Sequence, residues 1–174
     1  MNKKVFGVGG AFTVCIYRKK GENLDLVAES EFHNLYPSEG LDYILSSIFK
    51  GHTPSDPLYV GLLGGTVTPS PSMDWKMANQ GSLWDEFTSY SEGTRQEFID
   101  GPIDSAHQIS NTDNKAQFTI TGAGTIYGAF LCTDPTLDGT MGTLVCIGTF
   151  VGTARVVQPD DIVRVTYTVA GTNA

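Results

Sequence analysis

The chain has 174 residues, 40% hydrophobic and 17% charged, a composition that excludes a disordered protein and allows one domain with a sizeable apolar core. The net charge of −8 argues against a nucleic-acid partner, because phosphate binders need clustered Lys and Arg side chains. No apolar run of about eighteen residues occurs, so neither a membrane span nor a membrane partner is expected.

The first residues predict an arm followed by a hairpin. Residues 1–10 are Gly-rich and contain two lysines, so we expect a flexible N-terminal arm and not a signal sequence. Residues 11–17 and 24–32 alternate like strands and flank a turn-like segment at 18–23.

Residues 38–49 predict the main helix. Pro37 precedes the expected N-cap, Ser38, and Gly51 follows the last turn, which is normal helix punctuation. The apolar residues follow the i, i+3, i+4, i+7 spacing of one buried stripe: Leu41, Ile44, Leu45 and Ile48.

The middle of the chain predicts short elements around a long loop. A strand is expected at residues 58–63, and residues 64–82 read as a loop rich in Pro and Ser. The spacing of the aromatic residues in 82–90 fits one or two helical turns. Residues 96–99 predict a short strand.

From Ala116 onward the pattern is that of strands separated by turns. Four strands are expected, at residues 117–121, 125–133, 144–151 and 161–169. The predicted fold class is therefore all-β with one main helix: a single antiparallel β-sandwich domain over residues 11–174, jelly-roll-like.

No set of catalytic or metal-binding residues comes together by spacing. Neither GxSxG nor HExxH occurs. Asp85 and Glu86, beside aromatic residues, would fit a glycosidase only if two carboxyl groups met in a cleft, and we prefer solvated acids beside core aromatics. Asp134 and Asp138 offer oxygen ligands for calcium, but not at EF-hand spacing. We expect no enzyme activity, no cofactor and no bound metal.

The three cysteines point to a reducing compartment. Cys15, Cys132 and Cys146 all lie in apolar, strand-like runs, and no CxxC pair is present. We therefore expect three buried, reduced thiols and assembly in a reducing cytoplasm.

Four aromatic residues are the candidates for contact with a partner protein: Phe6, Trp75, Trp84 and Tyr90. Phe6 lies in the expected arm and Trp75 in the long loop, where an exposed aromatic side chain can anchor an interface. One alternative is that these residues pack in the core. A second alternative, for Trp75, Trp84 and Tyr90, is a sugar-binding platform.

Several segments resemble, in the same order, segments of virion structural proteins of tailed bacteriophages. One is the Glu-Gly-Leu-Asp-Tyr-Ile-Leu run at residues 39–45, which follows a predicted hairpin as it does in those proteins. The other resembling segments are residues 33–35, 59–62, 84–92 with Arg95, 110–111, 118–120, 125–131 and 159–168. Residues 76–82 and 96–97 depart from the pattern.

The resemblance implies a structural protein of a bacteriophage particle. Within that family it favours a capsid decoration (cement) protein on the outer surface of the head, made in the host cytoplasm. Its expected partners are the major capsid protein and neighbouring copies of itself, as a homo-oligomer (trimer or dimer). The alternatives are a tail, collar or fibre component and a carbohydrate-binding host-adhesion module.

Overall fold

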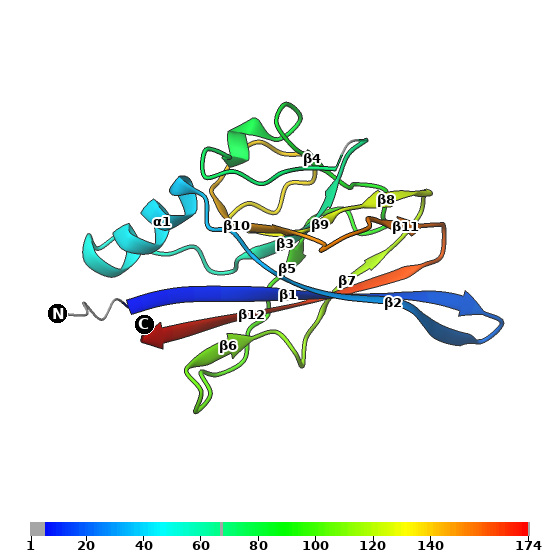
Figure 1. Ribbon diagram of the computed structural model, residues 1–174, viewed down its shortest axis with the longest axis horizontal. Coiled ribbons are helices and arrows are strands. Elements are labelled where there is room, and N and C mark those ends of the chain that lie inside the picture. The colour runs from blue at the N-terminus through cyan, green and yellow to red at the C-terminus, as the bar shows by residue number, and fades with distance from the viewer. Residues whose placement is uncertain (1–5, 67, 174) are drawn as a thin grey trace.

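A computed structural model describes the backbone of residues 6–66 and 68–173 and the side chains of residues 7–66 and 68–171. Two antiparallel sheets pack face to face, which confirms the predicted all-β sandwich (Figure 1). Sheet A has the order β2-β1-β12-β6, with β7 also paired to β12, and sheet B has the order β10-β9-β3-β4, with β5 also paired to β3. This order does not confirm a jelly roll.

The strands of sheet A are β1 (Phe6–Lys20), β2 (Asn23–His33), β6 (Gln108–Ser110), β7 (Ala116–Thr119) and β12 (Ile162–Asn173). Those of sheet B are β3 (Tyr59–Gly64), β4 (Asp85–Glu86), β5 (Gln96–Glu97), β9 (Gly128–Cys132) and β10 (Leu144–Thr149). A separate pair is formed by β8 (Gly124–Ile126) and β11 (Arg155–Val157).

The two longest strands, β1 and β12, join the two ends of the described chain. Their ladder runs from Phe6 opposite Asn173 to Tyr17 opposite Ile162. The expected arm is therefore wrong for residues 6–10, which form a paired strand, while residues 1–5 lie outside the described residues. A Cβ at Gly10 would lie 2.3 Å from the hydroxyl of Tyr167, so glycine is needed where that side chain crosses β1.

Sheet A is buried on one face only. Phe12, Val14 and Ile16 point into the core between the sheets, whereas Thr13 and Cys15 point outward and are half-exposed. This alternation is the period-2 pattern that made the first hairpin predictable from the sequence.

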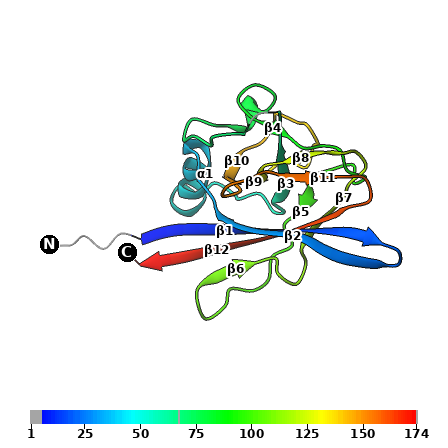
Figure 2. The same cartoon turned by 45° about the vertical axis from the view of Figure 1, so that its right-hand side comes forward.

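Sheet B is buried on both faces. Leu62 belongs to the core between the sheets, and its neighbour Leu63 belongs to a second apolar cluster on the far side. That far side is covered by the segment 64–84, of which residues 64–82 were predicted as a loop; the segment contains one 3₁₀ turn, η1 (Met77–Asn79). Figure 2 shows the three layers, with this segment above sheet B and sheet A below. Burial on both faces explains why β3, β9 and β10 read as continuous apolar runs.

Two local predictions are wrong because residues close in sequence pack into different layers of the fold. Residues 82–90 are not helical: β4 pairs with the end of β3, and Trp84 packs into the far cluster while Phe87 packs into the central core. The predicted strand 125–133 is broken at Tyr127, because β8 leaves sheet B to pair with β11, a strand that the sequence did not predict.

The helix α1 (Ser38–Phe49) has the predicted bounds and lies at the end of the sandwich where β1 begins (Figure 1). Its N-cap is Pro37, one residue earlier than expected. No helix among the described residues is long and apolar enough to cross a bilayer.

Candidate partner-binding surface

The helix α1 is seated on sheet B through a glycine and a glutamate. A Cβ at Gly40 would lie 2.0 Å from the backbone oxygen of Val145, so only glycine allows the helix to lie this close to β10. The Glu39 carboxylate accepts hydrogen bonds from the backbone N–H groups of Met77 (3.0 Å) and Leu144 (2.8 Å). These contacts fix which side of the helix faces the body.

Three of the four residues of the predicted stripe consequently face away from the body, while the fourth, Ile44, is half-buried beside a cavity. The exposed fractions are 39% for Leu41, 52% for Leu45, 59% for Ile48 and 76% for Phe49. The prediction of a buried stripe is therefore wrong for Leu41, Leu45 and Ile48, although the helix itself is confirmed. We call the side chains of Leu41, Leu45, Ile48 and Phe49 the apolar helix face. Adjacent exposed apolar side chains are typical of a protein–protein contact site.

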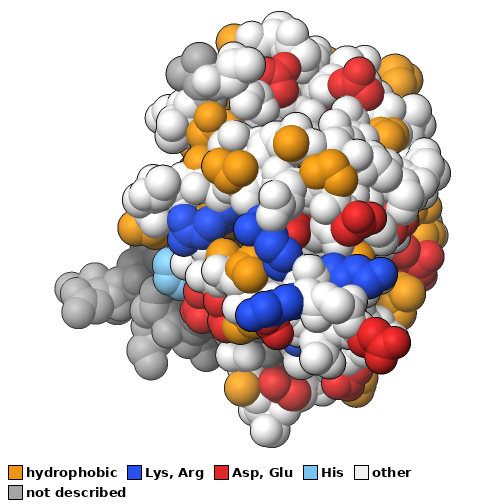
Figure 3. All heavy atoms as spheres, turned by 90° about the vertical axis from the view of Figure 1, so that its right-hand side faces the viewer, with side chains coloured by type: hydrophobic (Ala, Val, Ile, Leu, Met, Phe, Trp, Pro, Cys, Tyr) orange, Lys and Arg blue, Asp and Glu red, His pale blue; other side chains and the backbone are white. Residues whose placement is uncertain are grey.

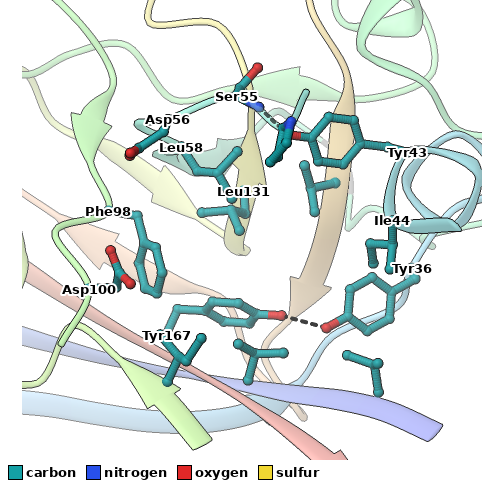
Figure 4. Close-up of a pocket in the computed structure, with 15 residues that line it drawn as sticks. Tyr36, Tyr43, Ile44, Ser55, Asp56, Leu58, Phe98, Asp100, Leu131 and Tyr167 are labelled. Carbon is teal, nitrogen blue, oxygen red and sulfur yellow. Dashed lines mark hydrogen bonds between the residues drawn. The ribbon is translucent and has the colours of Figure 1, made fainter. Parts of the chain in front are cut away.

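A cavity of about 530 Å³ opens beside this helix (Figure 4). Both sheets, α1 and the segment 54–58 contribute to its walls. Figure 4 shows Tyr43 and Ile44 of α1 on one side and Phe98 and Asp100 on the other. The volume lies within the range of cavities that bind small molecules, and it also suffices for one large apolar side chain of a partner.

Three tyrosine side chains line this cavity: Tyr36, Tyr43 and Tyr167. The hydroxyls of Tyr36 and Tyr167 are hydrogen-bonded to each other at 2.9 Å. Burial raises the pKa of both phenols, so both remain protonated at neutral pH. The hydroxyl of Tyr43 accepts a hydrogen bond from the backbone N–H of Ser55 at 2.6 Å, which ties the segment after the helix to the cavity wall.

The charged residues of the cavity are acidic. Asp56 and Asp100 line it, and no Lys, Arg or His is found among its described lining residues. Protonated tyrosines and exposed carboxylates can hydrogen-bond a ligand, and the apolar walls can pack against its apolar part. The arrangement favours recognition of an apolar group.

The structure places three of the four predicted contact residues inside the protein. Trp75 and Trp84 are buried in the far cluster, with their rings stacked 6.3 Å apart, and Tyr90 packs against Phe118 in the core. These three side chains are therefore not exposed anchors, and Trp75 instead holds the segment 64–84 onto sheet B. The side chain of Phe6 lies outside the described residues.

The structure also places the acidic residues that the sequence offered for catalysis and for calcium binding. Asp85 is exposed, as expected, but Glu86 is buried and forms an ion pair with Arg95 at 2.8 Å. The same guanidinium donates to the carbonyl oxygens of Asp134 (3.0 Å) and Gly139 (2.8 Å), so a side-chain cation occupies the oxygen-rich turn considered for calcium. Among the described residues no group of three or more His, Cys, Asp or Glu is placed to hold a metal ion.

The cysteines follow the expectation in part. All three are free; Cys132 and Cys146 are buried, whereas Cys15 is half-exposed on the outer face of sheet A. Burial raises the pKa of Cys132 to about 11 and that of Cys146 to about 12, so neither thiol ionises readily.

The sequence predicted neither the apolar helix face nor the cavity. Periodicity gives the spacing of an apolar stripe but not the direction in which it points. The available signal was the set of small residues on other sides of the helix, Gly40, Ser46 and Ser47, because small residues mark a close approach to a neighbouring element.

Comparison with protein-family models and with curated proteins finds no match for this chain.

Proposed function

We propose that the chain is a structural protein of a tailed-bacteriophage particle that decorates the outside of the head by binding the major capsid protein. The observation that carries this proposal is the apolar helix face beside the cavity. The order of segments that resemble phage virion proteins supplies the identity of the particle. The helix belongs to one of those segments, residues 39–45.

The docking mode follows from the shape of the site. The four side chains of the apolar helix face would lie against the capsid protein, and one large apolar side chain of that protein would enter the cavity. Each apolar side chain that passes from water into such a contact contributes about 1.5–3 kcal/mol. Only part of this gain becomes affinity, because association also costs translational and side-chain entropy.

Location in the particle distinguishes the first alternative from a decoration protein, and exposed aromatic residues distinguish the second. A tail, collar or fibre component would use the same apolar surface but would be present in few copies. A carbohydrate-binding module needs an exposed aromatic platform, and the burial of Trp75 and Trp84 weighs against one built from these residues.

Quantitative mass spectrometry of purified particles tests the proposal. A copy number comparable to that of the major capsid protein is the expected result. A few copies per particle would move the protein to the tail or collar. Its absence from purified particles would contradict a virion role altogether.

A further inference from the structure

The outer face of sheet A carries mostly small side chains at its centre. The ladder between β1 and β12 places Ala11 opposite Thr168, Thr13 opposite Thr166 and Cys15 opposite Arg164. All of these side chains point away from the core, and most of them are small. Short, half-exposed side chains over two long strands leave a surface on which another sheet can pack.

Opposite charges lie on the two sides of this centre. Glu29 and Glu31 of β2 lie opposite Cys15 and Thr13, respectively, while Arg164 of β12 lies on the other side of Cys15. Burial and the nearby Glu29 carboxylate raise the pKa of Cys15, and Lys115 and Arg164 oppose the rise, so both signs of charge act on the same point of the face.

Within the described chain these charges are not neutralised by each other. The ion pairs among the described residues are Arg18–Asp161 and Arg95–Glu86. Arg164 donates to the side-chain oxygen of Gln117 (3.0 Å) and lies over the ring of Tyr17, but no carboxylate reaches it. Seen from the hairpin end, Lys and Arg side chains form a band bordered by Asp and Glu side chains (Figure 3).

The positions of Glu29 and Arg164 are related by a simple symmetry. Both share a row with Cys15, one strand to each side of β1, and neighbouring strands lie about 4.8 Å apart. A rotation of 180° about an axis parallel to β1 beside Cys15 exchanges the two positions. In a pair of copies related by this axis, each Glu29 faces the other copy's Arg164. The face is therefore complementary to itself.

We propose that the outer face of sheet A binds the same face of a second copy across a two-fold axis that runs along β1. The ladder of twelve residue pairs makes this face about 40 Å long, a length sufficient for an interface of standard size. This inference does not rest on the proposed role in a particle, and the purified chain alone tests it.

Charge exchange tests the interface. In Glu29→Lys each new lysine faces Arg164 of the other copy, and in Arg164→Glu each new glutamate faces Glu29, so each variant places like charges together. We expect a dimer for the parent protein in sedimentation-equilibrium experiments and a dissociation constant raised on the order of a hundredfold in each single variant. The matched control is Glu22→Lys, which makes the same change of charge in the exposed hairpin turn and is expected to leave the dimer intact.

Rescue makes the test specific. An equimolar mixture of the two single variants restores both attractive contacts in the mixed dimer, and the double variant Glu29→Lys/Arg164→Glu restores them in its own dimer. We expect both samples to dimerise like the parent. A monomeric parent protein, or a dimer that neither single variant weakens, would overturn the inference. Weakening by both variants without rescue in either sample would also overturn it.

Discussion

At the scale of single residues, Arg95 is a buried charged group whose guanidinium is held by several partners. Its side chain and that of Glu86 are fully buried, and its guanidinium also satisfies two carbonyl oxygens of the turn before β10. The ion pair thus connects β4 to the turn at residues 134–139. Removal of one partner would leave a buried charge and unpaired acceptors, which is costly in a low-dielectric interior.

We predict that Arg95→Met lowers the free energy of unfolding by about 3–5 kcal/mol, as measured by urea denaturation. The control is Arg155→Met, because Arg155 is only half-buried and packs over the ring of Phe150; its expected loss is below about 1 kcal/mol. Equal stability of the two variants would contradict the structural role assigned to Arg95.

A second ion pair predicts a pH dependence. Burial alone would raise the pKa of Asp161, but hydrogen bonds from Arg18 (2.8 Å) and from the backbone N–H of Gln158 (3.0 Å) outweigh burial and hold the pKa below its ordinary value. The folded protein therefore binds this proton less readily than the unfolded chain. The stabilisation is complete above the ordinary carboxyl pKa of about 3.9 and is lost as the pH falls through the lower, folded value.

We predict that Asp161→Asn lowers the free energy of unfolding by about 1–3 kcal/mol at pH 7, because hydrogen bonds to a charged group are replaced by weaker ones. The difference between parent and variant should shrink as the pH is lowered below about 4. Denaturation curves at several pH values measure it. A difference that stays constant down to pH 2 would be inconsistent with a depressed pKa.

At the scale of elements, the orientation of α1 decides what the molecule presents to partners. Gly40 faces β10, and the side chains that would normally anchor an amphipathic helix face outward. The contact that fixes this orientation is a backbone-to-backbone approach, which a single methyl group would prevent.

We predict that Gly40→Ala destabilises the fold by about 1–3 kcal/mol, although alanine is a better helix former by about 1 kcal/mol. Asp42→Ala, at an exposed position of the same helix, should change stability by less than about 0.5 kcal/mol. Thermal or urea unfolding distinguishes the two variants. A stabilised Gly40→Ala protein would show that the helix does not rest on β10 through this residue.

Sequence patterns predicted local structure correctly in several places, but they did not predict contacts between residues far apart in the chain. The alternation in β1 and the stripe in α1 gave the hairpin and the helix bounds, because each depends on residues close in sequence. The pairing of β1 with β12 joins the two ends of the chain, and no local signal marks it. The burial of Trp75 depends on Trp84, at the end of the same segment, and on Phe130 of β9. The Pro-rich part of the segment, with one tryptophan, was therefore predicted to be an exposed loop.

At the scale of the whole molecule, the fold exposes two surfaces that differ in chemistry. The apolar helix face and the cavity lie at the end of the sandwich, and the charge-bordered face lies on sheet A. The proposed attachment to a shell and the proposed dimer would use one surface each. The two surfaces differ in chemistry, since the first is apolar and the second depends on paired charges, so we predict that salt weakens the proposed dimer more than the proposed attachment.

The most direct test of the proposed role is the binding of the purified protein to particles that lack it, followed by cosedimentation. The double variant Leu45→Ser/Ile48→Ser removes the centre of the apolar helix face, and Val156→Ser removes an apolar side chain, 72% exposed, from β11 as the matched control. We predict that both proteins fold like the parent, that the control binds like the parent, and that the double variant binds at least about tenfold more weakly. Parent-like binding by the double variant would contradict attachment through α1.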